Sequence, residues 1–267
     1  MTSDYEADFD AIVAASGSKL VRGYAASECN TAQQILPAAK SKGFQVVLGV
    51  WPDVEASFTA DTQAIQTYMP GYEAQVYAIT VGSETLYRGT FTGPQLLAKI
   101  NQVKQMFPGV LIGTADSWNK FADGTADAVV SGGVDLLLAN AFSYWQATPI
   151  SNATWNFFED IFGAMLHIED VLGKGNMGNV QFWVGETGWP TDGGSNYGAA
   201  IASTENAATF FSQGVCSILR WNVNTFYFEA FDESWKPASI GDDGQAEVET
   251  VWGAMTAQRE TKFSLKC

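Results

Sequence analysis

The feature that most constrains the fold is a regular alternation of short apolar runs with longer amphipathic stretches along the chain of 267 residues. Seven runs have the length and composition of strands. They cover residues 19–26, 44–52, 76–84, 109–118, 135–145, 180–186 and 225–231. These runs are apolar throughout, as in parallel strands that are covered on both faces. The pattern therefore predicts an α/β fold built on a parallel sheet.

Helices are predicted between these strands. Their expected ranges are 3–15, 31–43, 61–75, 92–107, 123–131, 155–172, 204–222 and 247–258. This alternation and the chain length are typical of a (β/α)8 TIM barrel, so we expect residues 1–267 to form a single catalytic domain. The helix at 3–15 has no strand before it. Closure of an eight-stranded barrel then requires a strand upstream of Met1, and we expect that first strand to be missing from this chain.

Charge and hydropathy exclude several classes of partner. The net charge is −15, which argues against nucleic acid or an anionic membrane surface, because both bind basic patches. No apolar run reaches the roughly 18 residues of a membrane span. The first ten residues lack the basic start and apolar core of a signal peptide. Asn152-Ala153-Thr154 is a glycosylation acceptor pattern and favours a secretory setting.

Cysteine and histidine are too few for most metal sites. The chain has one histidine and three cysteines, Cys29, Cys216 and Cys267, and no CxxC pair. Zinc or iron–sulfur ligation is therefore not expected, and neither a P-loop nor a dinucleotide fingerprint is present. We predict no metal and no cofactor. An odd number of cysteines leaves one thiol free or paired outside the chain.

Carboxylates and aromatic side chains gather where the predicted strands end. Glu84 closes the strand at 76–84 and Glu186 closes the strand at 180–186, each after a Val-Gly pair or Val-Gly-Ser. In a barrel, strand ends form the catalytic face. A single carboxylate there could simply cap a helix, but two that face each other are what glycoside hydrolysis requires. A Ser-His-Asp triad would need His167, which lies within a predicted helix.

Longer segments around these glutamates carry a family resemblance. "VYAITVGSETLYRG" and "FWVGETGWPTDGG" resemble the two active-site blocks of glycoside hydrolase family 17, in its fungal branch. Other segments match the same family in the same order: "KLVRGYAASECNT", "GFQVVLGVWP", "GTADSWN", "LANAFSYW" and "FEAFDESWKP". The resemblance implies a (β/α)8 barrel that acts on cell-wall β-1,3-glucan with retention of configuration, as a β-1,3-glucanase or a β-1,3-glucanosyltransferase.

The resemblance also implies roles for individual residues. Glu84 matches the general acid/base and Glu186 the nucleophile, so we expect their carboxyl groups about 5–5.5 Å apart. Glu233 and Lys236 match a glutamate and a lysine that line the cleft near the acid. The remaining positions expected to touch the substrate are Tyr24, Ser83, Asp116, Asn140, Phe142, Tyr144 and Trp189. Candidates for stacking on sugar rings, with core packing as the alternative, are Tyr144, Trp145, Trp189 and Trp235.

Two departures from the family pattern have consequences. Ser83 stands where plant members have an asparagine that bonds the sugar 2-hydroxyl, and the shorter serine needs a water or a neighbour to reach it. Family members also have an N-terminal cysteine that pairs with the C-terminal one, and this chain begins after it. The resemblance then implies a Cys29–Cys216 disulfide and leaves Cys267 unpaired.

Several properties stay open between alternatives. The two glutamates do not decide whether water or a sugar hydroxyl accepts the glycosyl group, so hydrolysis and transglycosylation are both expected. A non-catalytic β-glucan-binding protein of the cell wall is the rival interpretation. We predict a secreted or cell-wall protein that binds laminari-oligosaccharides, acts as a monomer, and has neither nucleic acid nor membrane as a partner.

Overall fold

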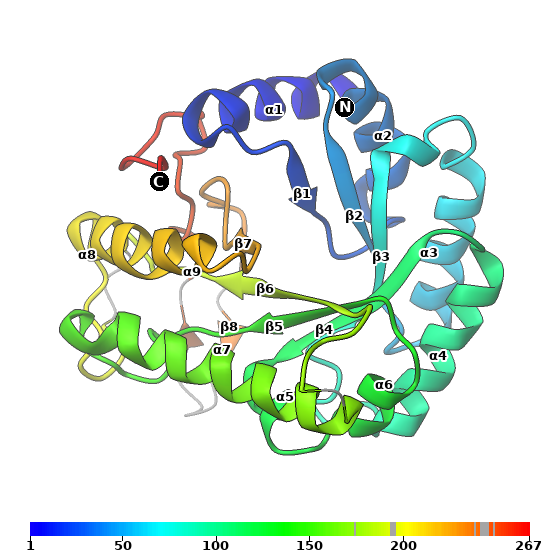
Figure 1. Ribbon diagram of the computed structural model, residues 1–267. Coiled ribbons are helices and arrows are strands. Elements are labelled where there is room, and N and C mark those ends of the chain that lie inside the picture. Colours follow the sequence, from blue (N-terminus) through cyan, green and yellow to red (C-terminus); the bar gives the residue numbers. More distant parts are fainter. Residues whose placement is uncertain (174, 193–195, 238, 241–245, 248) are drawn as a thin grey trace.

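The computed structural model describes residues 1–173, 175–192, 196–237, 239–240, 246–247 and 249–267. Within them, seven parallel strands form one sheet and curl into a nearly closed barrel (Figure 1). The strands are β1 (Leu20–Arg22), β2 (Gln45–Val50), β3 (Val76–Ser83), β4 (Leu111–Ser117), β5 (Leu136–Asn140), β6 (Gln181–Thr187) and β7 (Thr225–Tyr227). All seven predicted strands are confirmed, and so is the barrel class.

The strands follow one another around the barrel in chain order. Each pairs with the next in parallel, from β1 to β7. In the described part of the chain β1 pairs only with β2, and β7 only with β6, so the sheet is open between β1 and β7. A separate antiparallel pair is formed by β8 (Ser239–Ile240) and β9 (Ala246–Glu247).

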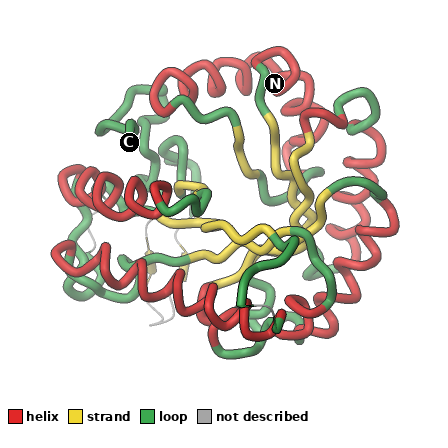
Figure 2. Tube along the Cα trace, viewed as in Figure 1, coloured by secondary structure: helices red, strands yellow, loops and turns green. Residues whose placement is uncertain are grey.

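Helices surround the barrel on its outside (Figure 2). The α-helices are α1 (Thr2–Ser16), α2 (Thr31–Lys42), α3 (Glu55–Tyr68), α4 (Gly93–Met106), α5 (Trp118–Ala122), α6 (Asp127–Ser131), α7 (Ile150–Leu172), α8 (Thr204–Phe210) and α9 (Cys216–Arg220). The short 3-10 helices are η1 (Glu28–Asn30) and η2 (Glu73–Gln75), and η3 (Phe211–Val215) is one turn of π-helix between α8 and α9. The prediction is corrected at two places. The range 204–222 is a helix with this π-turn inside it, and of the range 123–131 only Asp127–Ser131, which is α6, is helical.

The predicted helix at 247–258 is wrong. Residue 248 lies outside the described residues, and the remainder of this range contains no helix. Its backbone instead pairs with the segment after β7: the Glu229 amide donates to the Trp252 carbonyl, and the Ala254 amide donates to the Glu229 carbonyl. The indole of Trp252 is buried. Tertiary pairing therefore satisfies the backbone groups that a helix would have paired internally.

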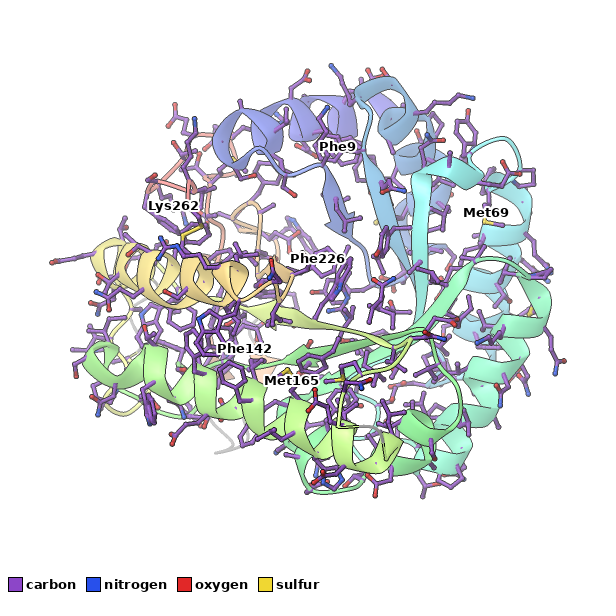
Figure 3. All side chains as sticks on the ribbon, viewed as in Figure 1. Phe9, Met69, Phe142, Met165, Phe226 and Lys262 are labelled. Atoms are coloured by element: carbon purple, nitrogen blue, oxygen red, sulfur yellow. A yellow bond between two sulfur atoms is a disulfide. The ribbon has the colours of Figure 1, made fainter. Side chains whose placement is uncertain are left out.

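The barrel interior is filled by side chains. Its cluster of buried residues is Val47, Ala78, Ala115, Leu136, Leu138 and Trp183. Phe226 of β7 packs against this cluster inside the barrel, whereas Phe9 of α1 belongs to the larger core between strands and helices (Figure 3). A filled interior leaves the strand ends as the place where a barrel binds a ligand.

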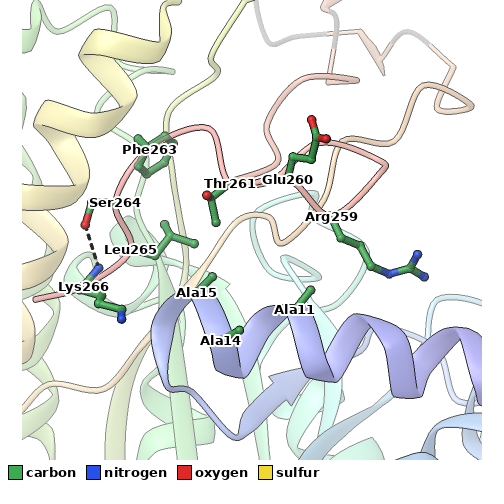
Figure 4. A pocket seen from close by; sticks show the side chains of 10 residues that line it. All are labelled: Ala11, Ala14, Ala15, Arg259, Glu260, Thr261, Phe263, Ser264, Leu265 and Lys266. Atoms are coloured by element: carbon green, nitrogen blue, oxygen red, sulfur yellow. Dashed lines mark hydrogen bonds between the residues drawn. The ribbon is translucent and has the colours of Figure 1, made fainter.

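The disulfide differs from the predicted one. Cys216 of α9 is bonded to Cys267, with a Cα–Cα distance of 5.2 Å, and Cys29 is free and exposed. The predicted Cys29–Cys216 pairing is wrong because Cys29 lies in η1, after β1, whereas the C-terminal segment comes back to α9. Beside that segment, a cavity of about 580 Å³ separates it from three alanines of α1 (Figure 4). None of the residues lining this cavity is a predicted site residue.

Candidate active site

The carboxyl ends of β3, β5 and β6 lose their regular pairing, and these irregularities turn side chains toward a common site. The β3–β4 register shifts between Thr80 and Ser83, and the β5–β6 register shifts so that Asn140 lies opposite Glu186. Glu84, directly after β3, has a φ of 58°, in the left-handed region. That conformation is costly for a residue with a side chain and is concentrated at functional sites.

Glu84 is a half-buried carboxyl group with one amide partner. The Asn140 side-chain amide donates to its Oε1 at 3.0 Å. Burial, and after it the negative charge of Glu186, raise the pKa of Glu84 to about 7, although the bond from Asn140 acts in the opposite direction. Glu84 is therefore largely protonated up to neutral pH, as a general acid must be.

Glu186, in contrast, is held in an ion pair. Arg22 Nη1 lies 3.0 Å from its Oε1, and the two side chains are only 3% and 12% exposed. The Ser83 hydroxyl donates to the same oxygen at 3.3 Å. A guanidinium bond to a carboxylate is charge-assisted and fixes the orientation of the acceptor. The second glutamate is thus a positioned anion.

The structure brings the two predicted glutamates to one site. Ser83 contacts Glu186 through its hydroxyl and is followed directly by Glu84. Asn140 lies opposite Glu186 in the sheet and bonds Glu84 through its side chain. Residues from β3, β5 and β6 therefore meet at the strand ends, as the sequence predicts for a barrel site.

Arg22 is a site residue that the sequence analysis missed. Besides Glu186, its guanidinium donates to the Gly185 carbonyl at 2.9 Å and to the Ser83 hydroxyl at 3.0 Å. The signal was present in "KLVRGYAA", because a charged residue inside an apolar strand is buried only when it has a partner.

Tyr24 lies against the same pair. The Arg22 guanidinium stands 4.7 Å from the centre of its ring. Burial raises the pKa of the Tyr24 phenol well above its usual value, and both the charge of Glu186 and a hydrogen bond to it act in the same direction. The predicted contact residue Tyr24 is therefore joined directly to the proposed nucleophile.

Glu233 and Lys236 are brought together with Glu229, which sequence reasoning had left out of the site. Lys236 Nζ lies 2.7 Å from a Glu229 oxygen and 2.8 Å from a Glu233 oxygen. Burial raises the pKa of Glu229 to about 8 against the hydrogen bond from Lys236. Burial acts to lower the pKa of Lys236, but the bonds to both glutamates raise it overall. In the residues that the structure describes, no ion pair joins Lys236 to Glu84 or Glu186. The positive charge of Lys236 is therefore paired with Glu229 and Glu233.

Asp116 is not a substrate contact. It is fully buried, and its two oxygens accept backbone N–H groups of Leu86, Tyr87 and Ser117. Burial raises its pKa to about 6, while these backbone bonds act against the rise. The prediction is corrected because Asp116 has no free oxygen for a sugar; it fixes the loop that follows Glu84.

Two predicted aromatic contacts are also core residues. Trp189 is fully buried and its indole donates to the Ile201 carbonyl at 2.9 Å. Tyr144 is 2% exposed and packs edge-on against Trp189 and Trp252. Neither ring can stack on a sugar, because both side chains are buried in the protein.

The three remaining aromatic candidates differ in how far their side chains are exposed to solvent. Phe142 is half-buried, with edge contacts to Phe228 and Trp252. Trp145 is half-buried and stacks on Trp252, whereas Trp235 is 73% exposed. Sugar contact by Phe142 or Trp235 therefore stays a prediction.

The described residues contain no group of three or more His, Cys, Asp or Glu side chains that could hold a metal ion. None of the described helices is both long enough and apolar enough to cross a membrane.

A parallel barrel that brings two glutamates together at its strand ends has the arrangement that glycoside hydrolases use. The chain belongs to the family described as the BtgE/BtgC glycoside hydrolase domain, whose model matches residues 1–253. The resemblance to family 17 is confirmed by both sequence and structure comparisons.

Curated relatives match along nearly the whole chain. The glucan 1,3-beta-glucosidase of Arthroderma benhamiae is 57% identical over 265 residues, which cover 99% of this chain and 85% of the relative. The glucan 1,3-beta-glucosidase of Saccharomyces cerevisiae is 42% identical over 278 residues, covering 100% and 86%.

Solved structures agree with this family. The family 17 β-1,3-glucanosyltransferase of Rhizomucor miehei matches with a TM-score of 0.84 and 28% identity, over 100% of this chain and 92% of that chain. An active-site mutant of that enzyme in complex with laminaritriose matches with a TM-score of 0.81 and the same identity and coverage.

Proposed function

We propose that this chain cleaves β-1,3-glucan by a retaining double displacement, with Glu186 as nucleophile and Glu84 as acid/base. The observation that carries this proposal is the contrast between the two carboxyl groups. Burial keeps Glu84 protonated near neutral pH, whereas Arg22 holds Glu186 as an oriented anion. Environments that separate two carboxyl groups in this way assign acid and nucleophile.

The names of the relatives support the substrate class. They are glucan 1,3-beta-glucosidases, and the solved glucanosyltransferase binds laminaritriose, a β-1,3-linked oligosaccharide. Both catalytic carboxyl groups and a strand-end site favour this function over a glucan-binding protein without catalysis.

In the first step, Glu186 attacks the anomeric carbon while Glu84 gives its proton to the departing glycosidic oxygen. Arg22 and Ser83 hold one oxygen of this carboxylate in place. In the second step, Glu84 removes a proton from an acceptor hydroxyl, which attacks the glycosyl-enzyme and releases the Glu186 carboxylate. A retaining enzyme is expected to hold the two carboxyl groups about 5–5.5 Å apart.

Water as acceptor gives hydrolysis, and a sugar hydroxyl gives transfer. We infer that the chain does both, with transfer increasing at high oligosaccharide concentration. Mass analysis of products from laminari-oligosaccharides tests this. Products longer than the substrate are expected at high concentration, and only shorter sugars at every concentration would contradict transfer.

Substitution tests the assignment of the glutamates. Glu186→Gln and Glu84→Gln should each lose turnover of laminarin while still binding laminaritriose in calorimetry, because the amide keeps the shape and removes the charge or proton. Glu205→Gln is the matched control, since Glu205 is exposed on α8. Full activity of Glu186→Gln would exclude it as the nucleophile.

We further propose that residues 1–267 act as one catalytic domain, as a monomer, in a secreted or cell-wall setting. The Cys216–Cys267 disulfide and the exposed Asn152 of the glycosylation pattern support an oxidising compartment. The net charge of −15 supports a neutral ligand over nucleic acid.

A further inference from the structure

We propose that Arg88 is a positioning residue for the acid/base, whose guanidinium fixes the peptide between Ser83 and Glu84 and so aims the Glu84 carboxyl group. The inference rests on the function proposed above, because it concerns the step in which Glu84 gives its proton to the leaving group. Arg88 acts through Glu84, and its contacts in the described part of the chain are with protein groups that surround the acid.

The peptide between Ser83 and Glu84 serves both halves of the active site. The Ser83 hydroxyl donates to Glu186 at 3.3 Å, and Glu84 is the acid. Glu84 has a φ of 58°, which is unfavourable for a residue with a side chain, so the contacts around it must hold this conformation. The direction of the Glu84 carboxyl group therefore depends on what bonds this peptide.

Both polar groups of this peptide are hydrogen-bonded. The Glu84 amide donates to the carbonyl of Ala115 in β4 at 3.0 Å. The Ser83 carbonyl accepts a bond from Arg88 Nη1 at 2.6 Å. The first bond joins two backbone groups and survives any change of side chain. The second is made by the side chain of Arg88, so substitution of Arg88 removes it.

The Arg88 guanidinium is itself held by residues that follow β2. Its Nη2 lies 2.9 Å from an oxygen of Asp53, and its central carbon lies 4.8 Å from the centre of the Trp51 ring. A planar guanidinium can bond a carboxylate and a carbonyl at the same time and pack on an indole, which an ammonium cannot match. Arg88 therefore ties the segment after β2 to the segment that carries the acid.

The loop after Glu84 is fixed from the opposite direction. The backbone amides of Leu86 and Tyr87 donate to the buried carboxyl group of Asp116, and the Arg88 amide donates to the Glu84 carbonyl at 2.9 Å. Asp116 thus holds the chain after the acid, and the Arg88 side chain holds the peptide before it. Without Arg88 the preceding peptide keeps only its bond to β4.

Arg88 also supplies positive charge to the surroundings of Glu84. Burial, and after it the negative charge of Glu186, raise the pKa of Glu84 to about 7, and the charge of Asp116 adds to this rise. The bond from Asn140 and the charge of Arg88 act to lower it. Once Glu84 has given up its proton, this charge favours the carboxylate that must act as base in the second step.

The stability of the fold should depend little on Arg88. The side chains of Arg88 and Asp53 are 36% and 19% exposed. Ion pairs that are open to solvent contribute little to stability. Arg88→Met should therefore leave the urea midpoint of unfolding unchanged while it lowers activity, which separates positioning of the acid from support of the fold.

Two substrates with different leaving groups test the proposal. Laminarin needs a proton on its departing oxygen, whereas the leaving group of 2,4-dinitrophenyl β-laminaribioside departs without one. Arg88→Met should lower kcat/KM for laminarin by about tenfold, the effect of one lost bond to a charged group. It should leave kcat/KM for the aryl glycoside within about twofold. Equal losses on both substrates, or no loss on laminarin, would overturn the proposal.

The pH dependence on laminarin gives a second, independent measurement. In Arg88→Met the alkaline limb of kcat/KM should move to higher pH, because the lost charge had favoured the ionised form of Glu84. Arg88→Lys keeps the charge, so its limb should stay in place, although its rate should be lower because the bonds to Ser83 and Asp53 are not reproduced together. An unmoved limb in Arg88→Met would contradict the role of Arg88, whether or not wild type cleaves the aryl glycoside.

Two further variants separate this proposal from the function on which it rests. Arg220→Met, at an exposed position in α9, should match wild type in both rates and in the pH profile. Glu84→Gln should lose laminarin turnover and retain cleavage of the aryl bond, because only the natural leaving group requires the acid. Cleavage of laminarin by Glu84→Gln at the wild-type rate would contradict the proposed function itself, whatever the Arg88 variants do.

Discussion

Glu84 and Glu186 have the same side chain, and only their surroundings make one an acid and the other an anion. Glu84 is shielded from water and lies near the negative charge of Glu186, so its neutral form is favoured despite the bond from the Asn140 amide. Glu186 has a guanidinium at 3.0 Å. The chemistry of the pair can therefore be changed by altering neighbours without altering either glutamate.

The pH profile follows from the raised pKa of Glu84. The free enzyme needs Glu84 protonated, so kcat/KM should fall as pH rises through about 7. Asn140→Ala removes a bond that favours the ionised form, and the alkaline limb should then move to higher pH. Steady-state kinetics on laminarin between pH 4 and about 9 would measure both. A limb that stays in place in Asn140→Ala would contradict the contact.

Arg22 gives the second prediction at this scale. Arg22→Met leaves Glu186 as a buried charge without its partner, a change that costs about 3–5 kcal/mol, so kcat/KM should fall by at least about 100-fold. Arg22→Lys should restore part of the rate, because an ammonium supplies the charge but not the planar set of donors that bonds Glu186, Gly185 and Ser83 together. Arg220→Met, at an exposed position in α9, is the control. Equal rates in Arg22→Met and wild type would remove Arg22 from the site.

Much of the site was predictable from residue type and position alone. Both glutamates, Ser83, Asn140 and Tyr24 lie at or just after strand ends, where the sequence places them, and hydrogen bonds join them there. Residue type and position did not separate the aromatic residues that could contact a sugar from those that pack in the core. An indole suits a sugar face and a protein core equally well, and only packing shows that Trp189 is covered.

Among the secondary-structure elements, the end of β6 determines whether the acid can be held. A Cβ on Gly185 would lie 2.5 Å from Asn140 Oδ1 and 2.8 Å from Leu138 Cβ. Glycine at this position therefore leaves the space in which the Asn140 side chain reaches Glu84.

Gly185→Ala should consequently displace Asn140 and lower kcat/KM by about tenfold or more, the effect of one lost bond to the acid. Gly163→Ala in α7 is the matched control. Nothing lies within 4 Å of its added Cβ, and alanine should raise the free energy of unfolding by up to about 1 kcal/mol. Steady-state kinetics and chemical unfolding of both variants measure these two effects. Wild-type kinetics in Gly185→Ala would mean that the end of β6 tolerates a side chain.

Strands were more predictable than helices for a physical reason. A parallel strand is buried on both faces and shows this in its own residues, as all seven runs did. The range 247–258 has helical spacing as well, but its amides pair with residues after β7. Those partners are distant in the chain, so the local spacing of apolar residues cannot predict them.

For the whole molecule, the Cys216–Cys267 disulfide closes a loop with a sequence separation of 51. In the chain-entropy model a loop of this length contributes about 4 kcal/mol to the free energy of unfolding. Cys216→Ser and Cys267→Ser should each lower it by about 2–4 kcal/mol, and the double variant should lower it no further.

Cys29→Ser is the built-in control, since Cys29 is exposed and free. Urea unfolding of the four variants and of wild type measures the effect. A large loss in Cys29→Ser would restore the pairing that the family resemblance implied. That pairing could not be corrected from the sequence, because connectivity depends on which cysteines the fold brings within about 7 Å.

The position of Arg22 has a consequence for how this molecule fails when heated. Arg22 is the last residue of β1, a strand of three residues that, among the described residues, pairs on one side only. Short edge segments open at lower free energy than the rest of a fold. The orientation of Glu186 therefore depends on a short edge strand. Catalysis should disappear on warming before ellipticity does, and substrate bound at the strand ends should delay that loss.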